Sequence, residues 1–342
     1  MLYIRTDMNE NIATGHMMRC MSIADAARSM GHETMFITSD NKGDELLKSN
    51  GFSNLVLGSD YLNLMQGIGL IEELVTDEDI LLIDTYSETK EFMDTLRGKV
   101  YTVYIDDMGE QVFNVDCIIC YPPYYPDFNY DDRYNINKTQ FLLGLEYAPL
   151  RKEFSNCKKK FIKDKIENIL IVSGGSDPDR VTPKLIEKLT EAVNENETIT
   201  AICGIYSGYY EELRERYSDP KYGVNIIPST TRIKDYFDEA DVVITAAGST
   251  IYELCATGTP AIAYTYADNQ MPNAGAFNKL GLIPYVGDVS GNNEFLLNCV
   301  SELMRLEDGR VRETRSIAMQ KIVTGNGAKN IVKRLIKNVS KK

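Results

Sequence analysis

His16 is the residue of this sequence best placed for proton transfer, because it stands at the start of an expected helix, Gly15–Met30, that follows an expected strand, Leu2–Thr6. The chain has only two histidines. The positive end of a helix dipole disfavours an imidazolium, so this position predicts a neutral ring that can accept a proton. Thr14 is expected to cap the helix, and Gly15 lets another group approach the backbone closely. The alternative is a histidine that only hydrogen-bonds a nearby backbone group.

Two further loops also join an expected strand to an expected helix, and both are rich in small residues. Such loops expose backbone N–H groups to an anion, although small residues serve any tight turn as well. Taken together the loops gain weight, because an acidic protein that handles a phosphate ligand needs local amide and helix-dipole sites. The residues expected to hold a nucleotide there are Gly174, Gly175 and Ser176 in one loop and Gly248, Ser249 and Thr250 in the other.

Glu253 has two interpretations from its spacing. Thr250 and Glu253 are separated as in a capping box, in which the carboxylate returns to the N–H of the cap residue. A carboxylate at this place could instead accept hydrogen bonds from the ribose hydroxyls of a nucleotide whose diphosphate lies at the helix end. Composition leaves both interpretations open. Thr182, followed by Pro183, is likewise expected to open a helix.

Polar side chains close several other expected strands. Asp268, Asn269 and Gln270 follow one strand of the second half, where they present groups to a cleft or cap a helix. In the first half, Asp84-Thr-Tyr86 and Asp106-Asp107 close two strands. These carboxylates lack a regular ligand spacing, so no metal site is predicted. Cys117 and Cys120, three apart on an expected strand, point to opposite faces and are expected in the core rather than on zinc.

Short β-rich runs alternate with helical stretches, which is typical of βαβ units and a parallel sheet. The strands are expected at 2–6, 33–38, 53–57, 79–84, 100–106, 116–121, 169–172, 198–203, 223–227, 241–245 and 260–264. We therefore expect an α/β protein with two Rossmann-like domains facing a cleft, residues 1–150 and 166–342, joined by a linker over 150–165. Residues 121–138 are rich in proline and aromatic residues and are expected to form a long loop. Ligands of open α/β sheets bind beyond the carboxyl ends of the strands, so the strand-to-helix loops should carry the function.

Composition excludes some classes of function. The net charge of −13 argues against nucleic-acid binding, since a polyanion would be repelled. An odd count of seven cysteines fits reduced thiols, and no apolar run reaches the length of a membrane span, so a cytoplasmic protein is expected. The stretch 324–342 carries six basic residues and no acid. It is expected to form a terminal helix with a solvated basic face, with contact to an anionic membrane as the alternative.

From its N-terminus onward, the sequence resembles a known family. Arg5-x-Asp7 and Ala13-Thr-Gly-His-Met-Met-Arg-Cys20 resemble the first motif of the PseG family, hydrolases of UDP-2,4-diacetamido-2,4,6-trideoxy-β-L-altropyranose in pseudaminic acid biosynthesis. Further segments resemble this family in the same order: 83–86, 105–107, 144–154, 174–177, 248–253, 267–270 and 325–328. The loop at 248–253 also resembles the nucleotide-binding region of the MurG-like glycosyltransferases, which implies the two-domain GT-B architecture.

The resemblance implies roles for these residues. The histidine that matches His16 activates water for attack at the anomeric carbon, UDP leaves, and neither metal nor cofactor is needed. Tyr86 and Asn269 match residues that line the sugar, and Arg5, Asp7, Gly15, Asp268 and Gln270 are grouped with them as the expected substrate-binding set. Gly248, Ser249, Thr250 and Glu253 match the part that holds ribose and diphosphate. The extra residues 121–138 could change which sugar fits.

Three functions are consistent with the sequence. The first is hydrolysis of a UDP-activated deoxy amino sugar to UDP and free sugar, in nonulosonate or surface-glycan synthesis. The second is a GT-B glycosyltransferase in which His16 deprotonates an acceptor hydroxyl. The third is a nucleotide-sugar binder without activity.

Overall fold

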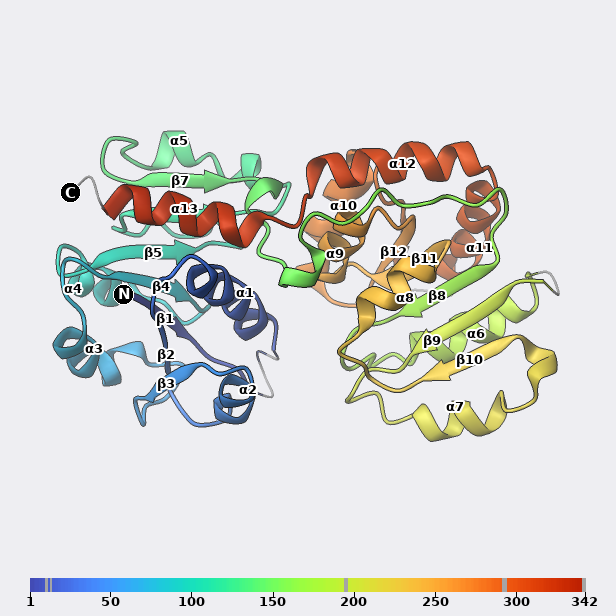
Figure 1. Ribbon diagram of the computed structural model, residues 1–342, viewed down its shortest axis with the longest axis horizontal. Coiled ribbons are helices and arrows are strands. Elements are labelled where there is room, and N and C mark those ends of the chain that lie inside the picture. The colour runs from blue at the N-terminus through green and yellow to red at the C-terminus, as the bar shows by residue number, and fades with distance from the viewer. Residues whose placement is uncertain (10–11, 13, 194–195, 291–293, 340–342) are drawn as a thin grey trace. The chain divides into compact units, whose positions relative to one another are not determined.

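The computed structural model describes residues 1–342 except 10–11, 13, 194–195, 291–293 and 340–342, so Ala13 of the N-terminal motif lies outside the described residues. The chain divides into two compact units (Figure 1). The first unit comprises Met1–Ser155 and Gly325–Lys342, and the second unit comprises Asn156–Thr324.

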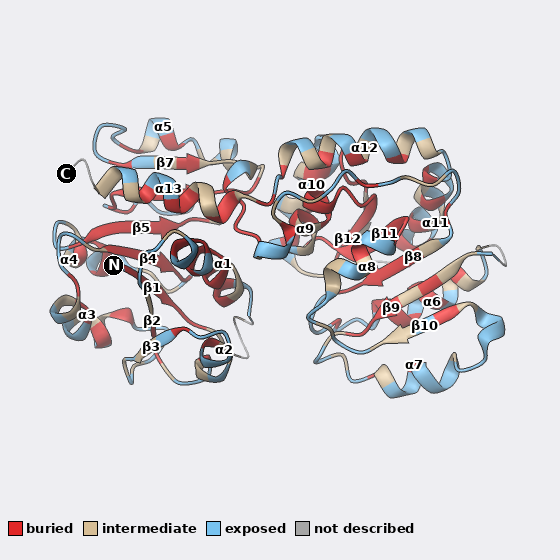
Figure 2. Ribbon diagram, in the orientation of Figure 1, coloured by how far each residue is buried: buried red, intermediate tan, exposed pale blue. Residues whose placement is uncertain are grey.

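The first unit is built on a parallel sheet with strand order β3-β2-β1-β4-β5-β6-β7 in its described residues. This order contains the Rossmann arrangement, with the reversal of strand order between β1 and β4. The strands are β1 (Leu2–Thr6), β2 (Thr34–Thr38), β3 (Ser53–Val56), β4 (Ile80–Asp84), β5 (Tyr101–Ile105), β6 (Cys117–Cys120) and β7 (Gln140–Leu143). Figure 2 shows the central strands of this sheet buried.

Helices cover the sheet of the first unit and expose their outer faces (Figure 2). They are α1 (Gly15–Ser29), α2 (Asp44–Ser49), α3 (Ile68–Leu74), α4 (Lys90–Leu96), α5 (Tyr130–Arg133) and α13 (Gly327–Val339). Short 3₁₀ turns lie at Leu64–Gly67, Tyr125–Phe128, Leu145–Tyr147 and Lys152–Phe154.

The terminal helix α13 belongs to the first unit, which differs from the expected second domain of 166–342. Its buried face, with Ile331, Val332 and Leu335, packs with the first unit, where α13 contacts α1. Two glycines allow the chain to pass close to the backbone of residues 148–154 after it leaves the second unit. A Cβ at Gly325, whose φ is +72°, would lie 1.8 Å from the carbonyl oxygen of Phe154, and one at Gly327 would lie 2.0 Å from that of Ala148. The apolar face of this helix was expected, but its packing against the first unit, which is distant in the sequence, was not.

The second unit has a parallel sheet with the Rossmann order β10-β9-β8-β11-β12-β13 in its described residues. Its strands are β8 (Asn168–Val172), β9 (Thr198–Ile202), β10 (Val224–Ile227), β11 (Val242–Ala246), β12 (Ala261–Thr265) and β13 (Tyr285–Asp288). Its helices are α6 (Val181–Thr190), α7 (Tyr210–Arg216), α8 (Ile233–Glu239), α9 (Thr250–Thr257), α10 (Met271–Lys279), α11 (Glu294–Leu306) and α12 (Gly309–Ile322). Short 3₁₀ turns lie at Pro220–Tyr222 and Asp268–Gln270. The expected α/β class with two Rossmann-like domains is thus confirmed.

Two strands, β7 and β13, were not expected. β7 follows the proline-rich segment 121–138, and the short β13 contains Gly287 at a φ of +122°, which weakens its strand pattern. The segment 121–138 is also more structured than a loop, because it includes α5. Within the described part of the chain, no helix is both long and apolar enough to span a membrane.

Candidate functional site

The first cluster of functional side chains forms where the strand order of the first unit reverses. Thr6, at the end of β1, pairs with Asp84, at the end of β4. Helix α1 begins after β1, so its first turn comes next to the end of β4. This adjacency brings His16 to Asp84, although the two residues are far apart in the sequence.

His16 is hydrogen-bonded to Asp84 through its Nδ1 atom, at 2.6 Å from Oδ1. The imidazole side chain is 9% exposed. Its ring packs edge-on against Tyr86, with 4.5 Å between ring centroids. Among the described residues, none is hydrogen-bonded to Nε2. A carboxylate only accepts hydrogen bonds, so Nδ1 carries the proton, and in the neutral ring Nε2 keeps the lone pair. The histidine thus has a side-chain partner rather than the backbone partner of the alternative interpretation.

Asp84 is held by three groups besides His16. Arg19 donates from Nε to Oδ2 at 2.7 Å and from Nη2 to Oδ1 at 2.5 Å, and the Cys20 thiol lies 3.2 Å from Oδ2. Burial alone would raise the pKa of the Asp84 carboxyl, but Arg19 and His16 outweigh it and hold that pKa well below its usual value. Asp84 is therefore ionised across the physiological range.

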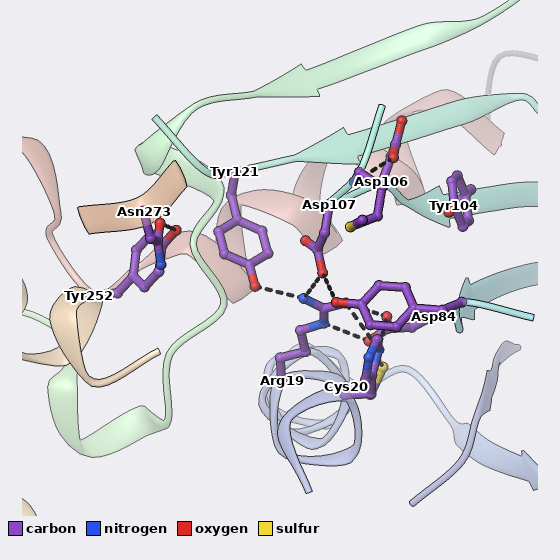
Figure 3. Close-up of polar contacts among 12 residues, drawn as sticks. Arg19, Cys20, Asp84, Tyr104, Asp106, Asp107, Tyr121, Tyr252 and Asn273 are labelled. Carbon is purple, nitrogen blue, oxygen red and sulfur yellow. Dashed lines mark hydrogen bonds and ion pairs between the residues drawn. The ribbon is translucent and has the colours of Figure 1, made fainter. Parts of the chain in front are cut away.

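Arg19 extends the network to a second carboxylate. Its Nη1 donates to Asp107 Oδ2 at 2.6 Å and to the Tyr121 hydroxyl at 2.9 Å (Figure 3). Tyr86 also donates to Asp107 Oδ2, at 3.1 Å. Burial and the nearby Asp107 raise the pKa of Tyr86 far above its usual value, so its hydroxyl keeps its proton. The result is a closed ring of contacts from His16 through Asp84, Arg19, Asp107 and Tyr86 back to His16.

Asp106 fixes the turn that carries Asp107. Its Oδ1 accepts hydrogen bonds from the backbone N–H groups of Met108 and Gly109, at 3.1 and 2.8 Å. Its Oδ2 accepts from the Tyr130 hydroxyl at 2.8 Å, and burial raises the pKa of Asp106 above its usual value. Arg133 of α5 donates to the carbonyl oxygen of Gly109. The segment 121–138 is thereby fastened to the turn after β5.

The carboxylates of this edge share a cationic side chain as their partner. In the part of the chain that the structure describes, no group of three or more His, Cys, Asp or Glu side chains could hold a metal ion. Asp84 and Asp107 are both paired with Arg19. Cys117 and Cys120 are buried on β6, as expected for core residues.

Arg5 and Asp7, expected to bind substrate, are buried and paired with each other. Arg5 donates from Nη1 to Asp7 Oδ2 at 2.6 Å and from Nη2 to Ser39 Oγ at 2.6 Å, and it is fully buried. Asp7 also accepts from the backbone N–H of Ser39 at 2.6 Å. These contacts connect the ends of β1 and β2, so the pair supports the sheet edge instead of offering free polar groups to a ligand.

The start of α1 differs in part from the expected cap. Thr14 occupies the N-cap position, but its backbone is already helical and its side chain makes no capping hydrogen bond. A capping side chain needs a more extended N-cap backbone to reach the next N–H groups. A Cβ built at Gly15 would meet nothing within 4 Å, so the backbone of this turn is approachable as expected.

In the second unit, a carboxylate of the loop after β8 already binds N–H groups at the start of the next helix. Asp177 is buried and accepts hydrogen bonds from the backbone N–H groups of Val181 and Thr182 at 2.8 and 2.9 Å. It also accepts one from the Tyr209 hydroxyl. Helix α6 begins at Val181, so Thr182 is not its N-cap; the carboxylate from upstream starts the helix earlier. Gly174, Gly175 and Ser176 are exposed, but the amides at the end of this helix are occupied by Asp177.

The loop after β11 is different, because its N-cap residue does not cap the helix with its side chain. Ser249 is the N-cap of α9, with a helical backbone and no capping hydrogen bond from its side chain. A Cβ built at Gly248 would meet nothing within 4 Å. Thr250 is the first helical residue, so Glu253 is one position beyond the N3 site of a capping box. The capping-box interpretation of Thr250 and Glu253 is therefore wrong, whereas ribose binding by Glu253 stays a prediction.

The loop after β12 contains residues with different surroundings. Gln270 is buried, and its Oε1 accepts a hydrogen bond from the backbone N–H of Tyr266 at 3.1 Å. Gln270 therefore closes its own turn, and its expected role in substrate binding stays a prediction. Asp268 and Asn269 are exposed at the carboxyl end of the sheet, where their expected role in substrate binding stays a prediction.

Sequence reasoning missed Arg19, Asp107, Tyr121 and Asp177 as organising residues. One signal was available, since Arg19 follows His16 by one helical turn and must share its face of α1. The partnership with Asp84 depends on the pairing of β1 with β4, which a single sequence does not reveal.

Comparison with known proteins finds similarities in sequence and in fold. Residues 169–335 match the glycosyltransferase family 28 C-terminal domain. The uncharacterized protein MJ1062 of Methanocaldococcus jannaschii is 27% identical over 270 residues, which cover 76% of this chain and 54% of that protein. The UDP-N-acetylglucosamine–N-acetylmuramyl-(pentapeptide) pyrophosphoryl-undecaprenol N-acetylglucosamine transferase of Sulfurovum sp. (strain NBC37-1) is 29% identical over 208 residues, 58% of this chain and 57% of that protein. The chain thus spans little more than half the length of these relatives.

The crystal structure of Acinetobacter baumannii MurG superposes with a TM-score of 0.73 at 15% identity, covering 98% of this chain and 99% of that one. This similarity concerns the fold and spans both units, whereas the family match concerns β8 to α13. Residues 169–335 are therefore similar to a glycosyltransferase family 28 C-terminal domain, and the chain shares the fold of MurG.

Proposed function

We propose that this protein is an enzyme that breaks the anomeric bond of a UDP-sugar, with His16 as the general base. The observation that carries the proposal is the bond from His16 Nδ1 to the ionised Asp84, which leaves Nε2 as the proton acceptor. A base of this kind contributes about 10²–10⁴-fold to a rate. In the proposed step, Nε2 takes the proton of an attacking O–H group, the oxygen bonds to the anomeric carbon, and UDP leaves with the bonding electron pair.

The second unit is proposed to hold the nucleotide. The match to the glycosyltransferase family 28 C-terminal domain supports this assignment, and so does the similarity to a relative named as a UDP-N-acetylglucosamine-using transferase. Within the unit, the start of α9 supports binding of the diphosphate, because the N-cap Ser249 does not cap the helix with its side chain. The N–H of Gly248 donates to the carbonyl oxygen of Ala246 at 2.8 Å, so the support comes from the N–H groups that follow it. Glu253 is proposed to accept the ribose hydroxyls. The occupied start of α6 gives no such support to Gly174, Gly175 and Ser176.

The attacking group defines two candidate reactions. Relatives named as glycosyltransferases support transfer to an acceptor hydroxyl, and this is the first candidate. The second candidate is hydrolysis of a UDP-activated deoxy amino sugar of the 2,4-diacetamido-2,4,6-trideoxy type. It is favoured by the first unit, which lies outside the family match except for α13 and carries the Gly15-His16 motif with the Arg19 network.

One experiment separates these reactions. The protein is incubated with a panel of UDP-sugars, with and without candidate acceptors, in water enriched in ¹⁸O. Transfer predicts UDP release that depends on an acceptor, with a glycoside as product. Hydrolysis predicts acceptor-independent release and ¹⁸O at the anomeric carbon of the free sugar. A protein that binds UDP-sugars but releases no UDP under any of these conditions would contradict the proposal and leave a binding protein.

A further inference from the structure

Arg19 lies beside the proposed base and has no role yet assigned. It follows His16 by three positions on α1, so both side chains lie on one face of the helix. Its side chain is 13% exposed, and all three guanidinium nitrogens are engaged. Nε and Nη2 hold the two oxygens of Asp84, and Nη2 also lies 3.1 Å from His16 Nδ1. Nη1 holds Asp107 and the Tyr121 hydroxyl.

The shape of the guanidinium matters for this arrangement. A planar fork can bind both oxygens of one carboxylate and still direct a third nitrogen to another, whereas a lysine ammonium is a single point charge. Asp84 ends β4 and Asp107 follows β5, so one side chain ties two neighbouring strand ends to α1. Asp107 in turn holds the hydroxyl of Tyr86, whose ring packs on His16.

The contacts determine which nitrogen of His16 carries the proton. The ionised Asp84 requires a donor at Nδ1. Without Arg19, two carboxylates would face each other with only His16 to offset their charge, and burial would raise the pKa of Asp84. The other titratable groups around Asp84 and His16 are the Cys20 thiol on α1, Tyr86 after β4, Asp107 after β5 and Tyr121 after β6. None of these is a cation that could replace Arg19.

We propose that Arg19 is a positioning residue that keeps His16 in the Nδ1–H tautomer, by holding both oxygens of Asp84 and, through Asp107, the hydroxyl of Tyr86. Its role in turnover rests on the proposed function, whereas its effect on the tautomer does not. Loss of Arg19 releases Asp84 to rotate or to take up a proton. The lone pair of His16 is then no longer confined to Nε2.

The tautomer can be measured directly, because the chain has only two histidines. The full-length protein is labelled with ¹⁵N-histidine, and His32→Gln assigns the two sets of signals. At pH 7.5 we expect wild-type His16 to show a protonated Nδ1 and an unprotonated Nε2. In Arg19→Met we expect a mixture of tautomers or an imidazolium. Arg28→Met is the matched control, since Arg28 lies on the same helix but contacts Asp25 and the backbone of Asn50 and Gly51.

Two further variants keep the test decisive. Arg19→Lys retains the charge without the fork, so a mixture of tautomers is expected, and this variant decides the matter if Arg19→Met does not fold. In Arg19→Ala, added guanidinium at millimolar concentration should restore the Nδ1–H signals. An unchanged wild-type pattern in Arg19→Met, or in Arg19→Lys if Arg19→Met does not fold, would overturn the proposal.

Turnover provides the second readout. We expect Arg19→Met to lower kcat by about 10–100-fold, with KM changed much less, as for other residues that orient a functional histidine. If the wild-type protein turns over no UDP-sugar, the proposed function fails while the tautomer measurement still decides the role of Arg19. If the wild type is active and Arg19→Met keeps both its kcat and its tautomer, the positioning role fails alone.

Discussion

The side chains and loops at the carboxyl end of the sheet differ between the two units. In the first unit, charged side chains from neighbouring strand ends bind one another around His16, so the chemistry is carried by side chains with fixed partners. In the second unit, the loops after β8 and β11 open two helices, of which α6 is capped by the buried Asp177 while α9 has no side-chain cap. A small-residue loop before a helix therefore does not by itself predict an anion site; the capping side chain decides which helix start is open.

The largest effect is expected from the first unit. His16→Leu should lower kcat by about 10²–10⁴-fold, because it removes the proposed base, while UDP affinity stays nearly unchanged. Steady-state kinetics measure kcat, and calorimetric titration measures the affinity for UDP. His32→Gln is the control for loss of a histidine. Wild-type turnover in the His16 variant would remove the proposed base.

The comparison of α6 with α9 predicts that two cap substitutions change the stability of the second unit by very different amounts. Asp177→Ala should destabilise the second unit by about 2–4 kcal/mol, because it leaves two helix N–H groups and the Tyr209 hydroxyl without their acceptor. Ser249→Ala should change stability by less than about 0.5 kcal/mol, since that side chain makes no capping bond. Thermal melts of both variants test this. Equal losses would show that the two helix starts are not distinguished by their caps.

A third prediction concerns the nucleotide. Glu253→Ala should weaken UDP binding by about 1.5–3 kcal/mol, or roughly 10-fold to 100-fold and more, because a charge-assisted bond to ribose is lost. Ribose is remote from the reacting bond, so KM should rise more than kcat falls. Calorimetric titration of UDP into the variant measures the loss. A UDP affinity equal to that of the wild type would remove Glu253 from the nucleotide site.

A pH effect on stability is expected from Lys160. Its ammonium is buried and donates to the carbonyl oxygens of Phe237 and Asp238 at the end of α8, at 2.7 and 2.6 Å. Burial lowers the pKa of Lys160 to about 8, against the opposing effect of Asp238. The unfolded chain binds this proton more tightly, so the contribution of Lys160 to stability rises as pH increases from about 8 to the ordinary lysine value.

The slope of Tm against pH tests this expectation. Lys160→Met should reduce the rise of stability between pH 8 and 10 relative to the wild type, whatever its effect at pH 7. Lys188→Met is a suitable control, since Lys188 is a surface residue paired with Glu191. Identical slopes in the wild type and the Lys160 variant would contradict the lowered pKa.

The smallest effect is expected from chelation. Because Asp84 and Asp107 are paired with Arg19, dialysis against EDTA should leave turnover unchanged. If activity is lost and Mg²⁺ or Mn²⁺ restores it, the carboxylates of the first unit must be reconsidered as metal ligands.

The alternation of strands and helices was enough to predict the fold class and most strands, because a parallel α/β sheet needs a helical segment between successive short apolar strands. The position of His16 at a helix start was also predictable from Gly15 and the strand before it. Its partner was not, since Asp84 reaches it only through the pairing of β1 with β4. Arg5, Asp7 and Gln270 were grouped with the expected substrate-binding residues of the resembled family, but their contacts within the fold were invisible in one sequence.

The return of α13 to the first unit has a consequence for the order of synthesis. The second unit is one continuous stretch of chain, so it can complete its fold as soon as it has left the ribosome. The first unit lacks the helix that contacts α1 until the residues that follow the second unit are made. Domains of most nascent chains fold from the N-terminus onward. Here the sheet of the first unit must wait, with the face beneath α13 uncovered, until the whole second unit has been synthesised.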